Sequence, residues 1–335
     1  MNTDPTSALL FRSMVITANG RARGSRPSGV YSGSLLRRHA IGPVHCDSPT
    51  GWSEAKLIVM RPKYFNRSSR KERVAAQYAS AQAAGEYAHA YEDSRTAGRF
   101  LRTRLRIVQD ILASCPGGDL LDAGCGPGIM AQTLLRSRPQ DFRISVLDQS
   151  RAMVEHCTTS TRSLGKVYPA VGQLEALPFA DATFDITLTM GVLEYTDARA
   201  AVDEISRVTR PGGLVVATML NPLSLYRITE WVLYRPLLRV LGAVEVCLRV
   251  PAGRRHRASA SGIHALTSGK LRRLMTQANL VQVELIYYDP AFPIPHFGRV
   301  PSRTARAERA GRERTTAPGS NRWLSTGYLV AARRG

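Results

Sequence analysis

The sequence has few cysteines, little lysine and no long hydrophobic run. Its 335 residues include five cysteines, an odd number without a C-x-x-C pair, which argues against a disulfide framework or a zinc site and indicates reduced thiols. No apolar stretch approaches the roughly 20 residues of a membrane-spanning helix, and the early apolar segment is interrupted by Arg12 without a basic leader. These absences predict a soluble, cytoplasmic chain that holds no metal.

Acidic residues are scarce as well. The 46 Lys and Arg residues outnumber the 26 Asp and Glu residues, for a formal net charge of +20, and lysine occurs only at positions 56, 63, 71, 166 and 270. Such a charge indicates an anionic partner, either nucleic acid or a membrane surface. A general coding bias towards arginine explains it equally well. The apolar content of 44% is sufficient for a sizeable core.

A strand, a glycine-rich turn and a helix start follow one another in residues 120–130, which read LLDAGCGPGIM. Gly124, Gly126 and Gly128 alternate with small or turn-forming residues. Residues without a Cβ atom let a ligand lie against bare backbone and tolerate positive φ. The helix start offers free N–H groups to an anionic group. This stretch therefore predicts a cofactor-binding loop.

The spacing of the glycines restricts the choice of cofactor. Counted from Gly124, a dinucleotide fingerprint needs a third glycine where Ile129 stands; counted from Gly126, it reaches Ala131, which leaves that reading open. A phosphate loop would need Gly-Lys-Ser/Thr after the turn, and this is absent. The pattern present is D-x-G-x-G-x-G, and Asp122 at its start would repel phosphates but suit a ligand with an ammonium group.

These residues resemble the first motif of the class I S-adenosylmethionine-dependent methyltransferases. Four further motifs of that family follow in order: an acid after the second strand, VGQLEALPF from position 171, FDITLTM leading into GVLEY from position 184, and RPGG from position 210. The last of these, at 210–213, is expected to form a turn into the fifth strand. The resemblance covers about residues 87–220 and is greatest to the ubiquinone and menaquinone biosynthesis branch and its relatives in secondary metabolism. It implies an α/β fold with a doubly wound, seven-stranded Rossmann-like sheet, mostly parallel, whose last strand is antiparallel.

The resemblance also implies which residues hold S-adenosylmethionine. Asp148, 24 positions after Gly124, would accept hydrogen bonds from the ribose diol. Gln173 stands where the family most often has Asp, and it keeps an acceptor for the adenine amino group. The complete expected set is Asp122, Gly124, Gly126, Gly128, Asp148, Gln149, Gln173, Leu174 and Met190.

Methyl transfer from a sulfonium requires acceptor and methyl group to be held in line, and neither a metal nor a covalent nucleophile. A base is needed only where the acceptor must lose a proton. His264 falls where related enzymes place a histidine near the acceptor, so it is the first candidate. Glu194 and Tyr195 are the next candidates, although family members often carry a histidine at the position of Tyr195.

The composition divides the chain into segments. Residues 1–70, rich in Ser, Gly, Pro and Arg, are expected to be a disordered basic extension, and residues 71–335 to form the methyltransferase domain. Two helices are expected before the first strand, where Tyr87 and Tyr91 either close over the cofactor or pack in the core. Residues 289–322 lack periodicity and are expected to be a flexible insertion.

Residues 221–264 are predicted to be a helical lid over the acceptor. They are densely apolar and include Tyr226 and Trp231, while no acid occurs between positions 246 and 283. Arg254, Arg255 and Arg257 would line the rim. The pattern favours a large hydrophobic acceptor, with or without an anionic group, or peripheral contact with a lipid surface. An ordinary helical cap with a solvated basic rim is the alternative.

Three functions agree with this sequence. The leading hypothesis is methyl transfer to a small-molecule or lipid-like acceptor that is quinone-like, polyketide-like or lipid-linked, through oxygen or carbon rather than nitrogen. An RNA methyltransferase is favoured by the charge but lacks the Asn/Asp-Pro-Pro-Tyr signature and a recognisable RNA-binding module. A non-catalytic S-adenosylmethionine-binding protein is the third. The sequence does not indicate the acceptor atom or the oligomeric state.

Overall fold

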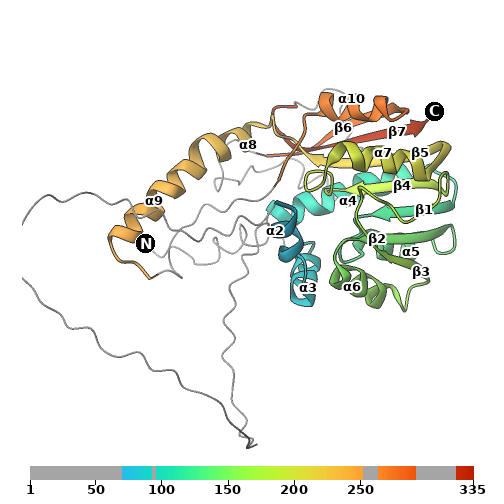
Figure 1. Cartoon of the computed structure of the whole chain (residues 1–335), viewed down its shortest axis with the longest axis horizontal. Helices are drawn as coiled ribbons and strands as arrows, with labels where there is room; N and C mark the ends of the chain where they lie inside the picture. The colour runs from blue at the N-terminus through green and yellow to red at the C-terminus, as the bar shows by residue number, and fades with distance from the viewer. Residues whose placement is uncertain (1–69, 93–95, 252–262, 292–321) are drawn as a thin grey trace, which may run out of the picture. The chain divides into compact units, whose positions relative to one another are not determined.

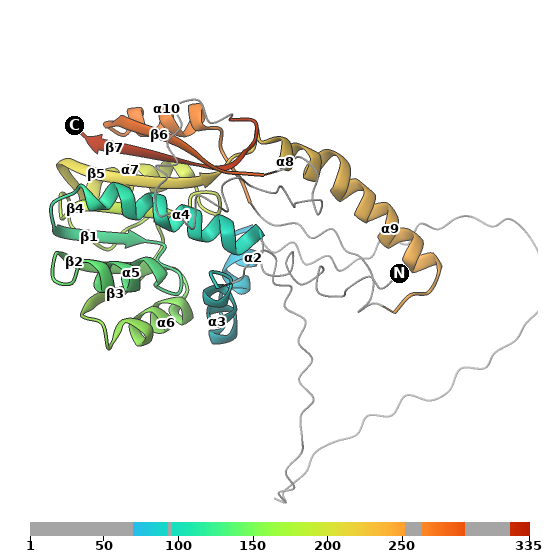
Figure 2. The same ribbon diagram turned by 180° about the vertical axis from the view of Figure 1, so that it is seen from behind.

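The computed structural model describes residues 70–92, 96–251, 263–291 and 322–335. Within these ranges the chain forms a seven-stranded sheet with helices on both faces (Figure 1), and Figure 2 shows the same arrangement from behind. The strand order is β3-β2-β1-β4-β5-β7-β6. The predicted extension 1–70 and insertion 289–322 fall almost wholly outside the described residues.

Within the described residues three helices precede the sheet, where the sequence predicted two. They are α2 (Arg70–Gln77), α3 (Ala81–His89) and α4 (Thr96–Ala113). The additional boundary lies at Ser80, whose side-chain oxygen accepts a hydrogen bond from the N–H of Ala83 at 3.1 Å and so starts α3. The prediction failed here because the apolar spacing continues across this serine cap.

After these helices come parallel strands with helices between most of them, and the last strand pairs antiparallel with its neighbours. In order, the elements are β1 (Gly118–Ala123), α5 (Ile129–Ser137), β2 (Phe142–Asp148), α6 (Arg151–Thr161), β3 (Val167–Val171), β4 (Phe184–Met190), α7 (Ala198–Val208), β5 (Thr209–Leu220), α8 (Leu225–Thr229), the π-helix η1 (Glu230–Tyr234), α9 (Arg235–Cys247), α10 (Ser268–Gln277), β6 (Leu280–Pro290) and β7 (Ser325–Arg334). Strands β1 to β5 pair in parallel, and β7 pairs antiparallel with both β5 and β6. The predicted fold class is confirmed.

One predicted turn is part of a strand. Residues 210–213, which read RPGG, lie within β5 as an irregularity in its pairing with β4, between Phe184 and Ile186. Gly212 has a φ of 76°, which a side chain would disfavour. Arg210 anchors the irregularity, because its guanidinium contacts Asp185 at 2.6 Å and Asp119 at 3.0 Å.

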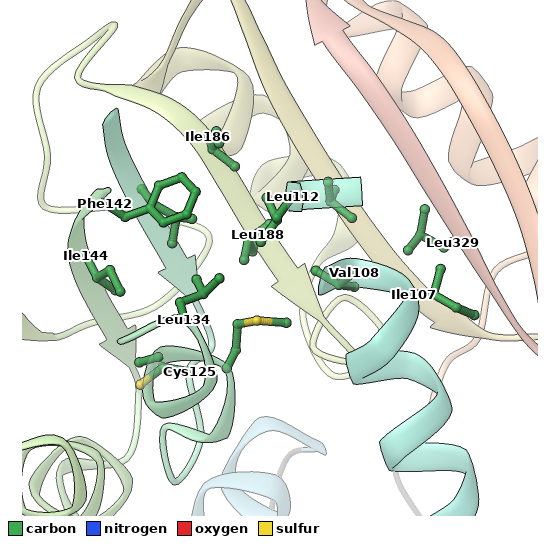
Figure 3. Packing of buried hydrophobic residues seen from close by; sticks show 14 of the residues in the cluster. Ile107, Val108, Leu112, Cys125, Leu134, Phe142, Ile144, Ile186, Leu188 and Leu329 are labelled. Atoms are coloured by element: carbon green, nitrogen blue, oxygen red, sulfur yellow. The ribbon is translucent and has the colours of Figure 1, made fainter. Parts of the chain in front are cut away.

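The sheet separates two hydrophobic layers. Alternate strand residues point to opposite faces, so Leu120 packs in the layer under α4 and α5, and Leu121 in the layer under α7 and α10. Figure 3 shows the first layer, where Val108 and Leu112 of α4 meet side chains from the strands. Burial of both faces is typical of parallel sheets and explains why their strands read as nearly continuous apolar runs.

The three glycines of the loop after β1 have different structural reasons. All have positive φ: 87° at Gly124, 52° at Gly126 and 84° at Gly128. A Cβ atom on Gly128 would lie 2.4 Å from the Sγ of Cys157, and one on Gly124 would lie 2.3 Å from a methyl carbon of Val192. A Cβ atom on Gly126 would meet only a ring carbon of Tyr87, at 3.8 Å. Packing therefore requires two of these glycines, whereas the third faces open space.

This difference predicts unequal stability losses for two matched substitutions. Gly126→Ala should lower the free energy of unfolding by about 1–2 kcal/mol, the cost of the left-handed conformation. Gly128→Ala should lower it by about 1–3 kcal/mol more, since overpacking against Cys157 is added. Denaturant unfolding measures both, and an equal or larger loss for Gly126→Ala would contradict the assignment.

Candidate functional site

A large cavity opens at the carboxyl ends of β1, β2 and β4. Its open volume, which includes solvent at the mouth, is about 1340 Å³. Seven of the nine predicted cofactor residues line it: Gly124, Gly126, Asp148, Gln149, Gln173, Leu174 and Met190. The carboxyl edge of a doubly wound sheet is where ligands of such folds bind. The cavity therefore has room for a cofactor and an acceptor.

Asp148 fixes the glycine loop to the end of β2. One carboxylate oxygen accepts a hydrogen bond from the N–H of Gly126 at 3.0 Å, and the other from the N–H of Ser150 at 2.9 Å. Ser150 in turn caps α6 by accepting from the N–H of Met153. A carboxylate has about four acceptor sites, so Asp148 can hold the loop and still accept hydrogen bonds from a ligand.

Tyrosine rings from the N-terminal helices line the cavity beside the loop. The ring of Tyr87 makes edge-on contacts with Tyr78 and Tyr91, and Tyr78 makes another with Tyr195. Burial raises the pKa of Tyr91 to about 12. The Tyr91 hydroxyl is therefore neutral at physiological pH, and the four rings give this part of the cavity an apolar wall.

Arg104 of α4 is a site residue that the sequence analysis missed. Its side chain is 5% exposed and lines the cavity, where one guanidinium nitrogen donates to the hydroxyl of Tyr91 at 3.0 Å and approaches that of Tyr87 at 3.5 Å. Its Nε has no hydrogen-bond partner within the described part of the chain. The available signal was a charged residue on the apolar stripe of this helix, four positions from both Phe100 and Val108.

Two buried acids accompany this arginine. Burial, with a smaller contribution from Asp148, raises the pKa of Asp122 to about 7, and neither of its oxygens finds a hydrogen bond among the described residues. Burial likewise raises the pKa of Glu194 to about 7, although Arg104 opposes the shift. Glu194 lines the cavity. Both carboxyl groups therefore change protonation near neutral pH.

The other predicted site residues differ in whether they line the cavity. Tyr195 lines it, and burial raises its pKa well above the usual range. The side chain of His264 is exposed and absent from the lining, although its backbone N–H donates to the carbonyl oxygen of Glu194 at 2.8 Å. Asp122 and Gly128 lie outside the lining as well. Glu194 and Tyr195 are thus better placed than His264 to reach a ligand.

The predicted lid is helical where it is described, in α8, η1 and α9. Trp231 and Arg235 line a small second cavity, which shares Leu220 and Ile263 with the large one. Tyr226 lines neither cavity. The predicted rim residues Arg254, Arg255 and Arg257 lie outside the described residues, so their role stays a prediction.

Comparison with known proteins gives matches centred on this part of the chain. Residues 121–217 match the family described as "Methyltransferase domain". A malonyl-[acyl-carrier protein] O-methyltransferase of Serratia marcescens is 32% identical over 166 residues, 49% of this chain and 59% of that protein. The ubiquinone/menaquinone biosynthesis C-methyltransferase of Geotalea daltonii is 33% identical over 105 residues, 30% of this chain and 45% of that protein.

The matches stop short of the relatives' full lengths. An uncharacterized 37.1 kDa protein in a transposon of Streptomyces fradiae is 35% identical over 116 residues, 34% of each chain. Among solved structures, magnesium protoporphyrin IX methyltransferase from Synechocystis aligns at 13% identity with a TM-score of 0.49, over 80% of this chain and 100% of that one. The matched segment covers less than two thirds of each of the three relatives. Residues 121–217 are thus similar to a methyltransferase domain, and they lie within an α/β fold of the kind that the resemblance to the class I S-adenosylmethionine-dependent methyltransferases implies.

Proposed function

We propose that this protein transfers a methyl group from S-adenosylmethionine to a hydrophobic small-molecule or lipid-linked acceptor. The observation that carries the proposal is the large cavity in which the glycine loop and Asp148 lie beside the buried Arg104 and Glu194, an acid whose pKa is raised to about 7. The names of the relatives support it, because they include methyltransferases for a carrier-bound acyl chain and for quinones.

The residues present fit this cofactor. The free space over Gly126 admits a ligand against the backbone, and Asp148 would accept from ribose hydroxyls. Arg104 has a buried N–H without a partner among the described residues, which suits a carboxylate. Asp122, buried beneath the loop with both oxygens unpaired in the described structure, favours a nearby ammonium group.

When bound, the cofactor supplies an electrophilic methyl carbon on a sulfonium. The chain's own contribution is to hold an acceptor in line with that carbon and to exclude water. Leu220 and Ile263 line both the large and the small cavity, and the tyrosine rings line the large one. We therefore propose that the acceptor's apolar part lies between the main cavity and the start of the lid.

We further propose Glu194 as the base where the acceptor has to lose a proton. A pKa of about 7 leaves the carboxylate substantially ionised near neutral pH and still able to take a proton, the condition in which general bases are most effective. His264 is exposed outside the lining and becomes the second candidate. Tyr195 beside Glu194 would orient the acceptor through its hydroxyl.

The role of Arg104 predicts a loss of cofactor affinity on replacement. Arg104→Met keeps the length and apolar stem of the side chain, so the fold should persist, but it removes a charged hydrogen bond worth about 1.5–3 kcal/mol. The dissociation constant for S-adenosylhomocysteine should rise about 10- to 100-fold by calorimetry. Arg106→Met, at an exposed position of the same helix, is the matched control and should change nothing. Equal affinities in the two variants would exclude the carboxylate contact.

The proposed base predicts a pH profile. Turnover, followed as transfer of labelled methyl groups from S-adenosylmethionine into cell extracts, should rise as pH increases through about 7, because Glu194 acts only when deprotonated. Glu194→Gln should lower turnover by about 10²–10⁴ without weakening cofactor binding, while His264→Gln should stay within a few-fold of wild type.

Three outcomes of that assay would count against the proposal. A large effect confined to His264→Gln would transfer the base role to the histidine. Label recovered in RNA instead of the lipid or small-molecule fraction would favour the alternative acceptor. Cofactor binding without turnover in any extract would favour a non-catalytic binding protein.

A further inference from the structure

Helix α9 exposes a continuous apolar surface. Leu237, Val240, Leu241, Val244 and, just beyond the helix, Leu248 recur at helical spacing and are 39–71% exposed; these five residues are the α9 apolar face. None of the residues of α9 is buried. An amphipathic helix of a globular domain normally turns such a stripe into the core, as α7 does with Val202 and Ile205.

The side of α9 that is partly covered is not the α9 apolar face. Arg235, Leu238, Gly242 and Glu245 are half-buried, whereas every member of the α9 apolar face is exposed. Pro236 at the start of α9 has no N–H and cannot donate a backbone hydrogen bond to the preceding turn. That turn is the π-helix η1. The η1 residue Glu230 is buried against Arg227 at 2.7 Å and Arg235 at 3.3 Å. These ion pairs fix the base of the helix.

The charges near the α9 apolar face indicate which kind of partner would bind it. Arg239 and Arg249 are exposed on or next to α9, and the sequence contains no acid between positions 246 and 283. A second copy of the chain, itself carrying a net charge of +20, would bring like charges together. A suitable partner would offer apolar groups to the leucines and valines and anionic groups to the arginines. A bilayer with anionic headgroups has both.

The length of the helix determines how it would meet such a surface. Its 13 residues span only about 20 Å, too short for the roughly 30 Å hydrocarbon core of a bilayer. Among the described residues no helix is long and apolar enough to cross a membrane. A helix of this kind lies along the interface, with its apolar face between the headgroups and its arginines at their level.

We propose that the α9 apolar face docks this protein on lipid bilayers with anionic headgroups. Docking would also bring lipid near the small cavity, because Trp231 of η1 and Arg235 at the start of α9 line it. This cavity shares Leu220 and Ile263 with the large one. Delivery of an acceptor from the bilayer is the part that rests on the proposed function. The docking itself does not depend on it.

Vesicle flotation of the full chain tests the docking. The protein should float with phosphatidylcholine vesicles that contain phosphatidylglycerol, bind far less to pure phosphatidylcholine, and bind less at about 1 M salt, where the screening length is about 3 Å. Val240→Gln/Val244→Gln should lower the partition coefficient about tenfold or more. The matched control, Val281→Gln/Val283→Gln, replaces two valines of similar exposure on β6 and should float like wild type.

Several results would overturn the proposal. The first is the absence of binding to any vesicle, and the second is equal flotation of the two double variants. The third is a dimer, detected by light scattering, that Val240→Gln/Val244→Gln converts to a monomer. That result would show that a second copy of the chain covers the α9 apolar face. Calorimetry with S-adenosylhomocysteine on the same samples separates the two proposals. Vesicle binding without cofactor binding would reject the proposed function alone, and the reverse would reject the docking alone.

Discussion

Three ionisable groups buried at one end of the sheet set the main physical constraint on this molecule. Arg104, Asp122 and Glu194 are each at most 5% exposed, and a buried charge is costly unless it is paired and hydrogen-bonded. Two features reduce this free-energy cost. The pKa of both acids is raised to about 7, and Arg104 donates hydrogen bonds to two tyrosine hydroxyls. Arg104 and Glu194 line the cavity, where a zwitterionic ligand would reduce the remaining cost.

The scaffold holds this arrangement through contacts within the chain. Asp148 joins the loop to β2 and, through Ser150, to the start of α6. Gly124 and Gly128 let the loop pack against Val192 and Cys157, so the loop has little freedom to move away from the strands. Gly126 differs from these two glycines because no side chain packs tightly over its Cα atom. Rigid support around one open position is what a binding loop requires.

Sequence reasoning predicted what depends on local chemistry. The glycine loop and the position of Asp148 at the end of a strand follow from residue type and spacing, and the structure contains both. Arg104 was missed because its role arises from contacts with Tyr87 of α3 and with Tyr91 just beyond that helix. The turn predicted at 210–213 became part of β5 because the ion pairs of Arg210 with Asp119 and Asp185 span three strands, which no local pattern encodes.

The central claim is that the buried charges and the glycine loop form one cofactor site. A crystal structure of the protein with S-adenosylhomocysteine tests it most directly. The account predicts the amino-acid carboxylate within hydrogen-bond distance of the Arg104 guanidinium, the ribose hydroxyls on Asp148, and backbone-to-ligand contact over Gly126. A ligand bound elsewhere in the cavity, with Arg104 still turned to the hydroxyl of Tyr91 and Asp148 making no ligand contact, would contradict it.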